Sequence, residues 1–121
     1  MLKQILIVDD SESIREVLAF SISNAGFQVL VACDGIEALK YFDGRTIDLL
    51  LTDYHMPNLN GLELILKIRQ IEHYKFIPIL VLTTENQVKM IKEARESGAT
   101  GWLTKPFNTE KLLQTLRKVI R

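Results

Sequence analysis

The chain has 121 residues and a mass of 13.9 kDa, the usual size of one domain. Hydrophobic residues make up 47% of it and charged residues 25%, a globular composition that excludes an intrinsically disordered protein. The apolar runs are too short to cross a bilayer and no export signal stands at the N-terminus, so we expect a cytoplasmic protein without membrane insertion. The single cysteine, Cys33, excludes an internal disulfide and lacks companions for a structural zinc site.

The charge of the chain is balanced overall but unevenly distributed. Residues 1–60 hold four basic and nine acidic residues, a net charge of −5, whereas residues 61–121 hold eleven and six, a net charge of +5. A chain with a net charge of zero has no general attraction for nucleic acid, so we expect no direct binding to it. The acidic first half therefore requires a local explanation.

Five short segments predict five β-strands, and three of them, at 4–8, 47–52 and 77–82, are apolar runs rich in branched residues. The five segments span residues 4–8, 28–32, 47–52, 77–82 and 101–104. Near-continuous apolar runs of this length are typical of strands covered on both faces, as in a parallel sheet.

Helical periodicity follows each of these segments. Gly26 and Gly98 end two of the helical patterns, Asp34 has the spacing of a helix start, and Asn108 is the predicted cap of the last helix. The apolar helix faces cover residues 14–25, 38–42, 64–71, 88–94 and 112–120. Strand and helix thus alternate five times, which predicts an α/β fold with right-handed crossovers and a parallel sheet between two layers of helices.

Polar residues stand where four of the predicted strands end. Asp9 and Asp10 follow the first strand, Asp53 the third, Thr83 the fourth and Lys105 the fifth. Taken singly, each has a simpler explanation as a helix cap, a turn residue or a solvated charge. Because ligands of open α/β sheets bind at the carboxyl ends of the strands, we expect these side chains to form one site.

The residue types at these strand ends indicate a particular chemistry. Three carboxylates at one sheet edge repel one another unless a cation lies between them. All-oxygen ligation suits Mg²⁺, with Mn²⁺ as the alternative, and both ions commonly take a phosphate oxygen as a further ligand. Lys105 adds a positive charge and Thr83 a hydroxyl donor, so the set predicts transfer of a phosphoryl group to a carboxylate.

Four segments carry a resemblance to a known family. They are Val8-Asp9-Asp10, Asp53-Tyr-His-Met-Pro57 followed by Gly61, Thr83-Thr84-Glu85, and Gly98-Ala-Thr-Gly-Trp-Leu-Thr-Lys-Pro-Phe107. In this order and spacing the chain resembles the receiver domain of two-component response regulators over essentially its whole length, so we expect one receiver domain over residues 1–121. It is most similar to the stand-alone chemotaxis response regulators (CheY-like), chiefly because nothing follows the fifth helix.

The resemblance implies a flavodoxin-like (βα)5 sandwich with the strand order 2-1-3-4-5. It implies that Asp53 accepts a phosphoryl group from a histidine of a sensor kinase. Asp10 and Asp53 would ligate Mg²⁺ directly, Asp9 would act through a bound water, and the backbone carbonyl of His55 would complete the protein ligands.

The resemblance also implies which residues bind the phosphoryl group and which change conformation in response to it. Thr83 would donate its hydroxyl to it, and Lys105, preceding a cis bond to Pro106, would pair with it. Trp102 occupies the aromatic switch position, with a packing residue as the simpler explanation. His55 and Glu85 are predicted to tune the lifetime of the phosphorylated state, with a solvated loop residue as the alternative for His55.

The implied partners are a sensor histidine kinase and an output protein such as a flagellar motor switch component, with a phosphatase as a further candidate. The resemblance implies that the protein is a monomer and that it is a signalling switch rather than an enzyme. The resemblance gives the receiver its own self-phosphorylation and autodephosphorylation chemistry. The surface of the last two helices and the last strand is the expected contact region. Its polar residues are Lys89, Lys92, Glu93, Lys111, Gln114 and Lys118.

Three alternatives remain open. A flavodoxin-like cofactor binder would need a phosphate-binding loop where Asp9 and Asp10 stand. A metal-dependent hydrolase would carry its acceptor in the first strand and leave Asp53 without a role. A receiver fragment of a hybrid kinase or of a DNA-binding regulator would share all these motifs.

Overall fold

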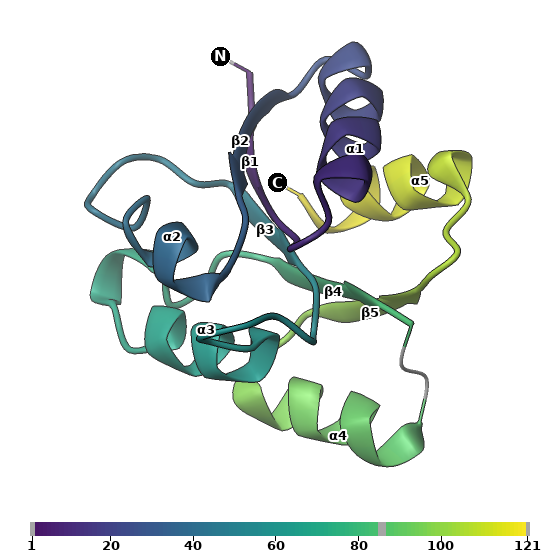
Figure 1. The fold of residues 1–121 in the computed structure, drawn as a ribbon. Helices are drawn as coiled ribbons and strands as arrows, with labels where there is room; N and C mark the ends of the chain where they lie inside the picture. Colours follow the sequence, from purple (N-terminus) through teal and green to yellow (C-terminus); the bar gives the residue numbers. More distant parts are fainter. Residues whose placement is uncertain (1, 85–86, 121) are drawn as a thin grey trace.

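The computed structural model describes residues 2–84 and 87–120, and its elements alternate along the chain as the sequence predicts (Figure 1). The elements are β1 (Gln4–Val8), α1 (Glu12–Asn24), β2 (Gln28–Ala32), α2 (Gly35–Leu39), β3 (Leu49–Thr52), α3 (Gly61–Arg69), a short 3₁₀ helix η1 (Glu72–Tyr74), β4 (Ile79–Thr83), α4 (Val88–Ser97), β5 (Gly101–Thr104) and α5 (Thr109–Val119).

The five strands form one parallel sheet in the order β2-β1-β3-β4-β5, which confirms the expected topology. Helices α1 and α5 cover one face of the sheet, and α2, α3 and α4 cover the other (Figure 1). The chain passes from β1 outward to β2 and then back across β1 to β3. The strand order therefore reverses beside β1, and the carboxyl ends of β1 and β3 lie next to each other at this point.

The hydrophobic core consists of one apolar layer on each face of the sheet. Leu6 and Val8 of β1 pack toward the α2–α4 side, whereas Ile5 and Ile7 pack toward α1 and α5. All four side chains are at most 1% exposed, and complete burial of one such side chain contributes about 2 kcal/mol. Covering both faces explains why the strand sequences are continuously apolar rather than alternating.

Side-chain caps determine where the helices begin. Asn60 and Glu63 form a reciprocal capping box at the start of α3, because each side chain accepts a hydrogen bond from the backbone N–H of the other, at 2.9 and 3.0 Å. Gly98 ends α4 in the left-handed conformation, with φ of 113°. These caps keep the connections between strands and helices short.

Four predicted boundaries were wrong by two or three residues. α2 ends at Leu39, whereas the periodicity placed Phe42 in this helix, and Phe42 packs in the core without being helical. β3 begins at Leu49 rather than at residue 47. β4 begins at Ile79, because Pro78 has no N–H to donate to the sheet. α3 ends at Arg69, whereas the periodicity placed Ile71 in this helix. Ile71 has an extended backbone but still packs against the core, so it preserves the apolar pattern without being helical.

Within the described part of the chain, no helix combines the length and the apolar character that spanning a bilayer requires.

Candidate functional site

Asp9 lies directly after β1 and is held at both its backbone and its side chain. It is 1% exposed, and its N–H donates to the carbonyl of Ala32 at 3.2 Å. Its carboxylate Oδ1 accepts from the backbone N–H of Ser11 at 2.9 Å, and its carbonyl accepts from Nη1 of Arg15 at 2.7 Å. This carboxylate therefore has a fixed position at the end of the strand.

Asp53 lies directly after the neighbouring strand β3 and is also buried, at 8% exposed. Its N–H donates to the carbonyl of Val8 at 2.9 Å, and its Oδ1 accepts from the N–H of Tyr54 at 2.8 Å. A Cβ atom at Gly61 would collide with the carbonyl oxygen of Asp53. Glycine at position 61 therefore allows α3 to start close beside the carboxylate.

Asp9, Asp10 and Asp53 form the acidic cluster that the strand ends predicted. One carboxylate oxygen of each residue lies within 4.8 Å of the others. Asp9 and Asp53 are buried, whereas Asp10 is exposed to solvent. Such a set of hard oxygen donors, open to water on one side, fits a small divalent cation that keeps part of its hydration shell.

Lys105 lies between two of these carboxylates. Its Nζ is 2.7 Å from Oδ2 of Asp9 and 3.3 Å from Oδ2 of Asp53. The residue follows β5, the Lys105–Pro106 bond is cis as the resemblance implied, and the Lys105 N–H donates to the carbonyl of Thr83 at 2.7 Å. Burial disfavours the ammonium charge, but the hydrogen bonds and charges of Asp9 and Asp53 outweigh that effect and raise the pKa of Lys105.

The pKa of the Asp53 carboxyl is raised above its usual value of 3.8. Burial is the main cause and the negative charge of Asp9 adds to it, while the ammonium of Lys105 acts in the opposite direction. The folded state therefore binds this proton more tightly than the unfolded state does. As pH rises from the usual aspartate pKa through the raised one, the folded protein loses stability.

We therefore expect Asp53→Asn to stabilise the metal-free protein at neutral pH by about 1 kcal/mol, which raises Tm by about 4 °C. The gain should shrink as pH falls toward the usual aspartate pKa. Thermal melts in chelator across this pH range measure it. The matched control is Asp43→Asn, because Asp43 is exposed and its hydrogen bonds with Arg45 lower its pKa to about 2, so this change should not stabilise. An Asp53→Asn protein that melts below the wild type at neutral pH contradicts the expectation.

Thr83 and Trp102 lie in the neighbouring strands β4 and β5. Thr83 is the last residue of β4 and is 1% exposed. Trp102 in β5 is half-buried on the α2–α4 side, and its ring centroid lies 5.8 Å from that of Tyr54, whereas Leu103 faces the opposite layer. This placement agrees with strand alternation, and the switching roles of both residues remain predictions.

His55 and Glu85 are the two residues predicted to tune the lifetime of the phosphorylated state. His55 is exposed in the segment after β3, and its ring packs edge-on against Tyr54 with centroids 4.6 Å apart. Glu85 lies outside the described residues. Both roles remain predictions.

Two residues near the cluster were not identified as site residues from the sequence. Asn58 has a positive φ of 70°, and its Nδ2 donates to Oδ2 of Asp34 at 3.0 Å. Asp34 was recognised only as a helix start. The sequence did offer a signal for Asn58, because an asparagine in a short connecting segment often marks a sharp turn.

Known proteins of similar sequence include chemotaxis regulators and a sensor kinase. Residues 5–117 match the family model of the response regulator receiver domain. The chain is 34% identical over 119 residues to the chemotaxis protein CheY1 of Helicobacter pylori, with 97% of this chain and 96% of that protein covered. It is 41% identical over 112 residues to the CAI-1 autoinducer sensor kinase/phosphatase CqsS of Vibrio cholerae, but this match covers 92% of the chain and only 16% of that protein.

Solved structures with the same fold include two informative neighbours. The Vibrio cholerae chemotaxis protein CheY4 matches with a TM-score of 0.95 and 42% identity, over 99% of this chain and 100% of that one. The receiver domain of the Pseudomonas aeruginosa sensor histidine kinase PA1611, described with a magnesium ion coordinated in its active site cleft, matches with a TM-score of 0.90 and 26% identity over 98% of each chain. The matched family model, the strand order and the similarity to chemotaxis regulators agree, and the chain belongs to the response regulator receiver domains, with a CheY-like fold.

Proposed function

We propose that this receiver domain is a phosphorylation-activated switch whose phospho-acceptor is Asp53. The observation that carries the proposal is the meeting of oxygens from Asp9, Asp10 and Asp53 within 4.8 Å, with the Lys105 ammonium against two of them. Asp53 directly follows the central strand β3 and lies beside Asp9 and Asp10, which follow β1. It is therefore the carboxylate best placed to receive a phosphoryl group between a cation and a lysine.

The cation we assign to this cluster is Mg²⁺, with Mn²⁺ as its chemical alternative. Asp10 and Asp53 are the proposed direct ligands, together with the backbone carbonyl of His55. Lys105 lies closer to Asp9 than to Asp53, at 2.7 Å against 3.3 Å, which supports an action of Asp9 through water. The bound cation would neutralise negative charge on the phosphoryl oxygens.

The proposed transfer takes the phosphoryl group from a phosphohistidine of a sensor kinase. An oxygen of Asp53 forms the new P–O bond as the P–N bond breaks, and the imidazole leaves with the electron pair and takes up a proton from solvent. Thr83 donates its hydroxyl to the phosphoryl group, and Lys105, whose raised pKa keeps it charged, pairs with it. Water later cleaves the acyl phosphate and releases phosphate, which resets the carboxylate.

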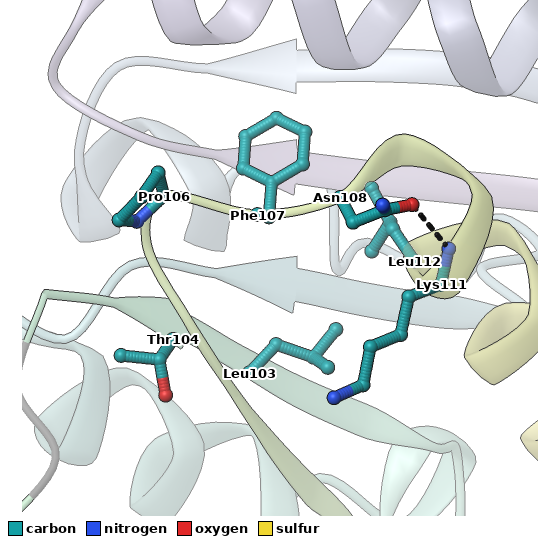
Figure 2. Close-up of a pocket in the computed structure, with 7 residues that line it drawn as sticks. All are labelled: Leu103, Thr104, Pro106, Phe107, Asn108, Lys111 and Leu112. Atoms are coloured by element: carbon teal, nitrogen blue, oxygen red, sulfur yellow. Dashed lines mark hydrogen bonds between the residues drawn. The ribbon is translucent and has the colours of Figure 1, made fainter.

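The proposed output surface is formed by α4, β5 and α5. Its polar residues are all exposed except Glu93, which is half-buried; they are Lys89, Lys92, Glu93, Lys111, Gln114 and Lys118. A hollow of about 320 Å³ lies at the β5 edge of α5, with Leu103, Phe107 and Leu112 in its lining and Lys111 beside them (Figure 2). A hollow lined by apolar side chains together with Lys111 supports a partner that offers an apolar side chain and an acidic neighbour.

By analogy with the chemotaxis relatives, we propose a flagellar motor switch component as the output partner and a phosphatase as a second one. In the same proposal the switch acts as a cytoplasmic monomer. Phosphorylation at Asp53 shifts the population toward a state in which the output surface binds its partner more tightly.

We expect a small acyl phosphate with Mg²⁺ to add one acid-labile phosphoryl group to the chain, at Asp53. Intact-mass measurement and peptide mapping detect the group and its position. Asp53→Asn should abolish the labelling, whereas Asp43→Asn, at an exposed carboxylate paired with Arg45, should keep it. A label on Asp9 or Asp10 would exclude this proposal and favour the hydrolase alternative.

A second candidate function is that of the receiver unit of a larger regulator. It is favoured by the 41% identity to CqsS, a match that covers 16% of that kinase. The acceptor chemistry is the same in this case, but the phosphoryl donor or the output lies in the same polypeptide. The gene sequence on both sides of the coding region for these residues distinguishes the two candidates.

A further inference from the structure

A side-chain hydrogen bond joins two loops at the carboxyl edge of the sheet, the edge that also carries the acidic cluster. Asn58 belongs to residues 53–60, the segment that begins with the acceptor Asp53 and leads into α3, and its Nδ2 donates to Oδ2 of Asp34 at 3.0 Å. Asp34 stands directly before α2, 24 residues away along the chain. We propose that Asp34 and Asn58 are positioning residues that hold this segment in the conformation that binds the cation. The inference rests on the proposed function.

The Asp34 carboxylate connects helix and segment because its two oxygens have different partners. Oδ1 accepts from the backbone N–H of Glu37 at 2.8 Å and caps α2, while Oδ2 accepts from Asn58. The bonds from Glu37 and Asn58 lower the pKa of Asp34, so the carboxylate is ionised at neutral pH. The hydrogen bond from Asn58 is therefore charge-assisted. The Asp34 carboxylate that accepts it is held in place by capping the first turn of α2.

The segment around Asn58 turns sharply and depends on this residue. Asn58 has a φ of 70°, a left-handed conformation that asparagine tolerates better than most residues. On either side of it, the N–H of Leu59 donates to the carbonyl of Pro57, and the N–H of Gly61 donates to the carbonyl of Tyr54, both at 2.8 Å. Asn58 is thus at the tip of a closed turn, where one side-chain bond can set the position of the whole turn.

Packing supports the same connection next to the hydrogen bond. A Cβ atom at Gly35 would lie 2.7 Å from the carbonyl oxygen of Leu59, so the first residue of α2 touches the backbone of the segment. Leu59 is itself buried, at 6% exposed. The start of α2 therefore both bonds to the segment and packs against it.

A displacement of the segment would reach the acceptor through Tyr54. The N–H of Tyr54 donates to Oδ1 of Asp53 at 2.8 Å, and the Tyr54 ring lies 5.8 Å from the ring of Trp102. The same segment carries the His55 carbonyl that we assign to the cation. Loss of the bond between Asp34 and Asn58 should therefore weaken cation binding, and Trp102 is a nearby fluorescent reporter of it.

The test compares Mg²⁺ dissociation constants of single and double variants, measured by Trp102 fluorescence and repeated with Mn²⁺ by electron paramagnetic resonance. Asp34→Ser keeps a helix cap but is too short to reach Asn58. Asn58→Gly keeps the left-handed backbone and removes the amide. Each single variant should bind Mg²⁺ about three- to tenfold more weakly, and the double variant no more weakly than the singles, because both remove the same bond.

Two further variants separate positioning from charge. Glu37→Gln removes a neighbouring negative charge but not the bond and should change the Mg²⁺ dissociation constant by less than about twofold. Asp34→Asn should bind Mg²⁺ with nearly wild-type affinity. The asparagine can cap α2 with its side-chain oxygen and donate a hydrogen bond from its side-chain N–H to the Asn58 oxygen once the Asn58 amide has flipped. Circular dichroism and metal-free melts confirm that each variant is folded.

The outcomes distinguish this inference from the proposed function. A wild-type chain without any response to Mg²⁺ overturns both. A wild type that binds Mg²⁺, together with Asp34→Ser and Asn58→Gly proteins of equal affinity, overturns the positioning role alone. So does a weakening by Glu37→Gln equal to that of Asp34→Ser, because the effect is then one of charge.

Discussion

Mg²⁺ is expected to raise the melting temperature of this protein by stabilising its folded state by about 1–3 kcal/mol, when its concentration is well above the dissociation constant. Each kcal/mol corresponds to about 4 °C for a chain of this length. The physical reason is the acidic cluster, in which oxygens of Asp9, Asp10 and Asp53 lie within 4.8 Å and repel one another without a cation. Scanning calorimetry in millimolar Mg²⁺ and in chelator measures the difference.

Asp10→Asn should remove most of this response, because Asp10 is the solvent-exposed member of the cluster and a proposed direct ligand. The same change should raise the stability of the metal-free protein, since it removes one of three like charges. Glu12→Gln is the matched control: Glu12 is an exposed acidic residue in the first turn of α1 and should leave the response intact. A melting curve that does not change across millimolar Mg²⁺ would argue against the assignment of a cation to this cluster.

Beryllofluoride with Mg²⁺, a mimic of the aspartyl phosphate, is expected to change the fluorescence of Trp102 and to reduce its access to a soluble quencher. Trp102 is the single tryptophan of the chain and lies half-buried, three residues before Lys105. If Thr83 moves toward the phosphoryl group, space opens beside the indole, which can turn inward. Burial of the ring contributes about 2 kcal/mol, enough to bias a two-state equilibrium tenfold or more.

The reference for this experiment is Mg²⁺ without beryllofluoride, because the metal alone can quench the indole. Asp53→Ala removes the acceptor and Thr83→Ala removes the hydroxyl, so both should suppress the beryllofluoride-dependent part. Unchanged quencher access in a protein whose Asp53 is demonstrably occupied would identify Trp102 as a packing residue.

The sequence by itself determined the succession of elements and the members of the acidic cluster. Continuous apolar runs at β1, β3 and β4 predicted buried parallel strands, because helices on both faces leave no side of such strands to solvent. In a parallel sheet the carboxyl ends of all strands point to one edge. The polar residues that follow the strands, Asp9, Asp10, Asp53 and Lys105, could therefore be grouped before their distances were known.

The tertiary structure alone decided how the grouped residues divide their contacts. Asp9 and Asp10 are adjacent and chemically identical, yet Asp9 is buried and paired with Lys105, while Asp10 faces solvent. Their difference depends on how the turn after β1 leaves the sheet, which periodicity does not describe. The bond between Asp34 and Asn58 depends likewise on how the start of α2 packs against the segment before α3. Local sequence patterns specify elements because their causes are local, whereas contacts between loops appear only when the packed sheet and helices bring them together.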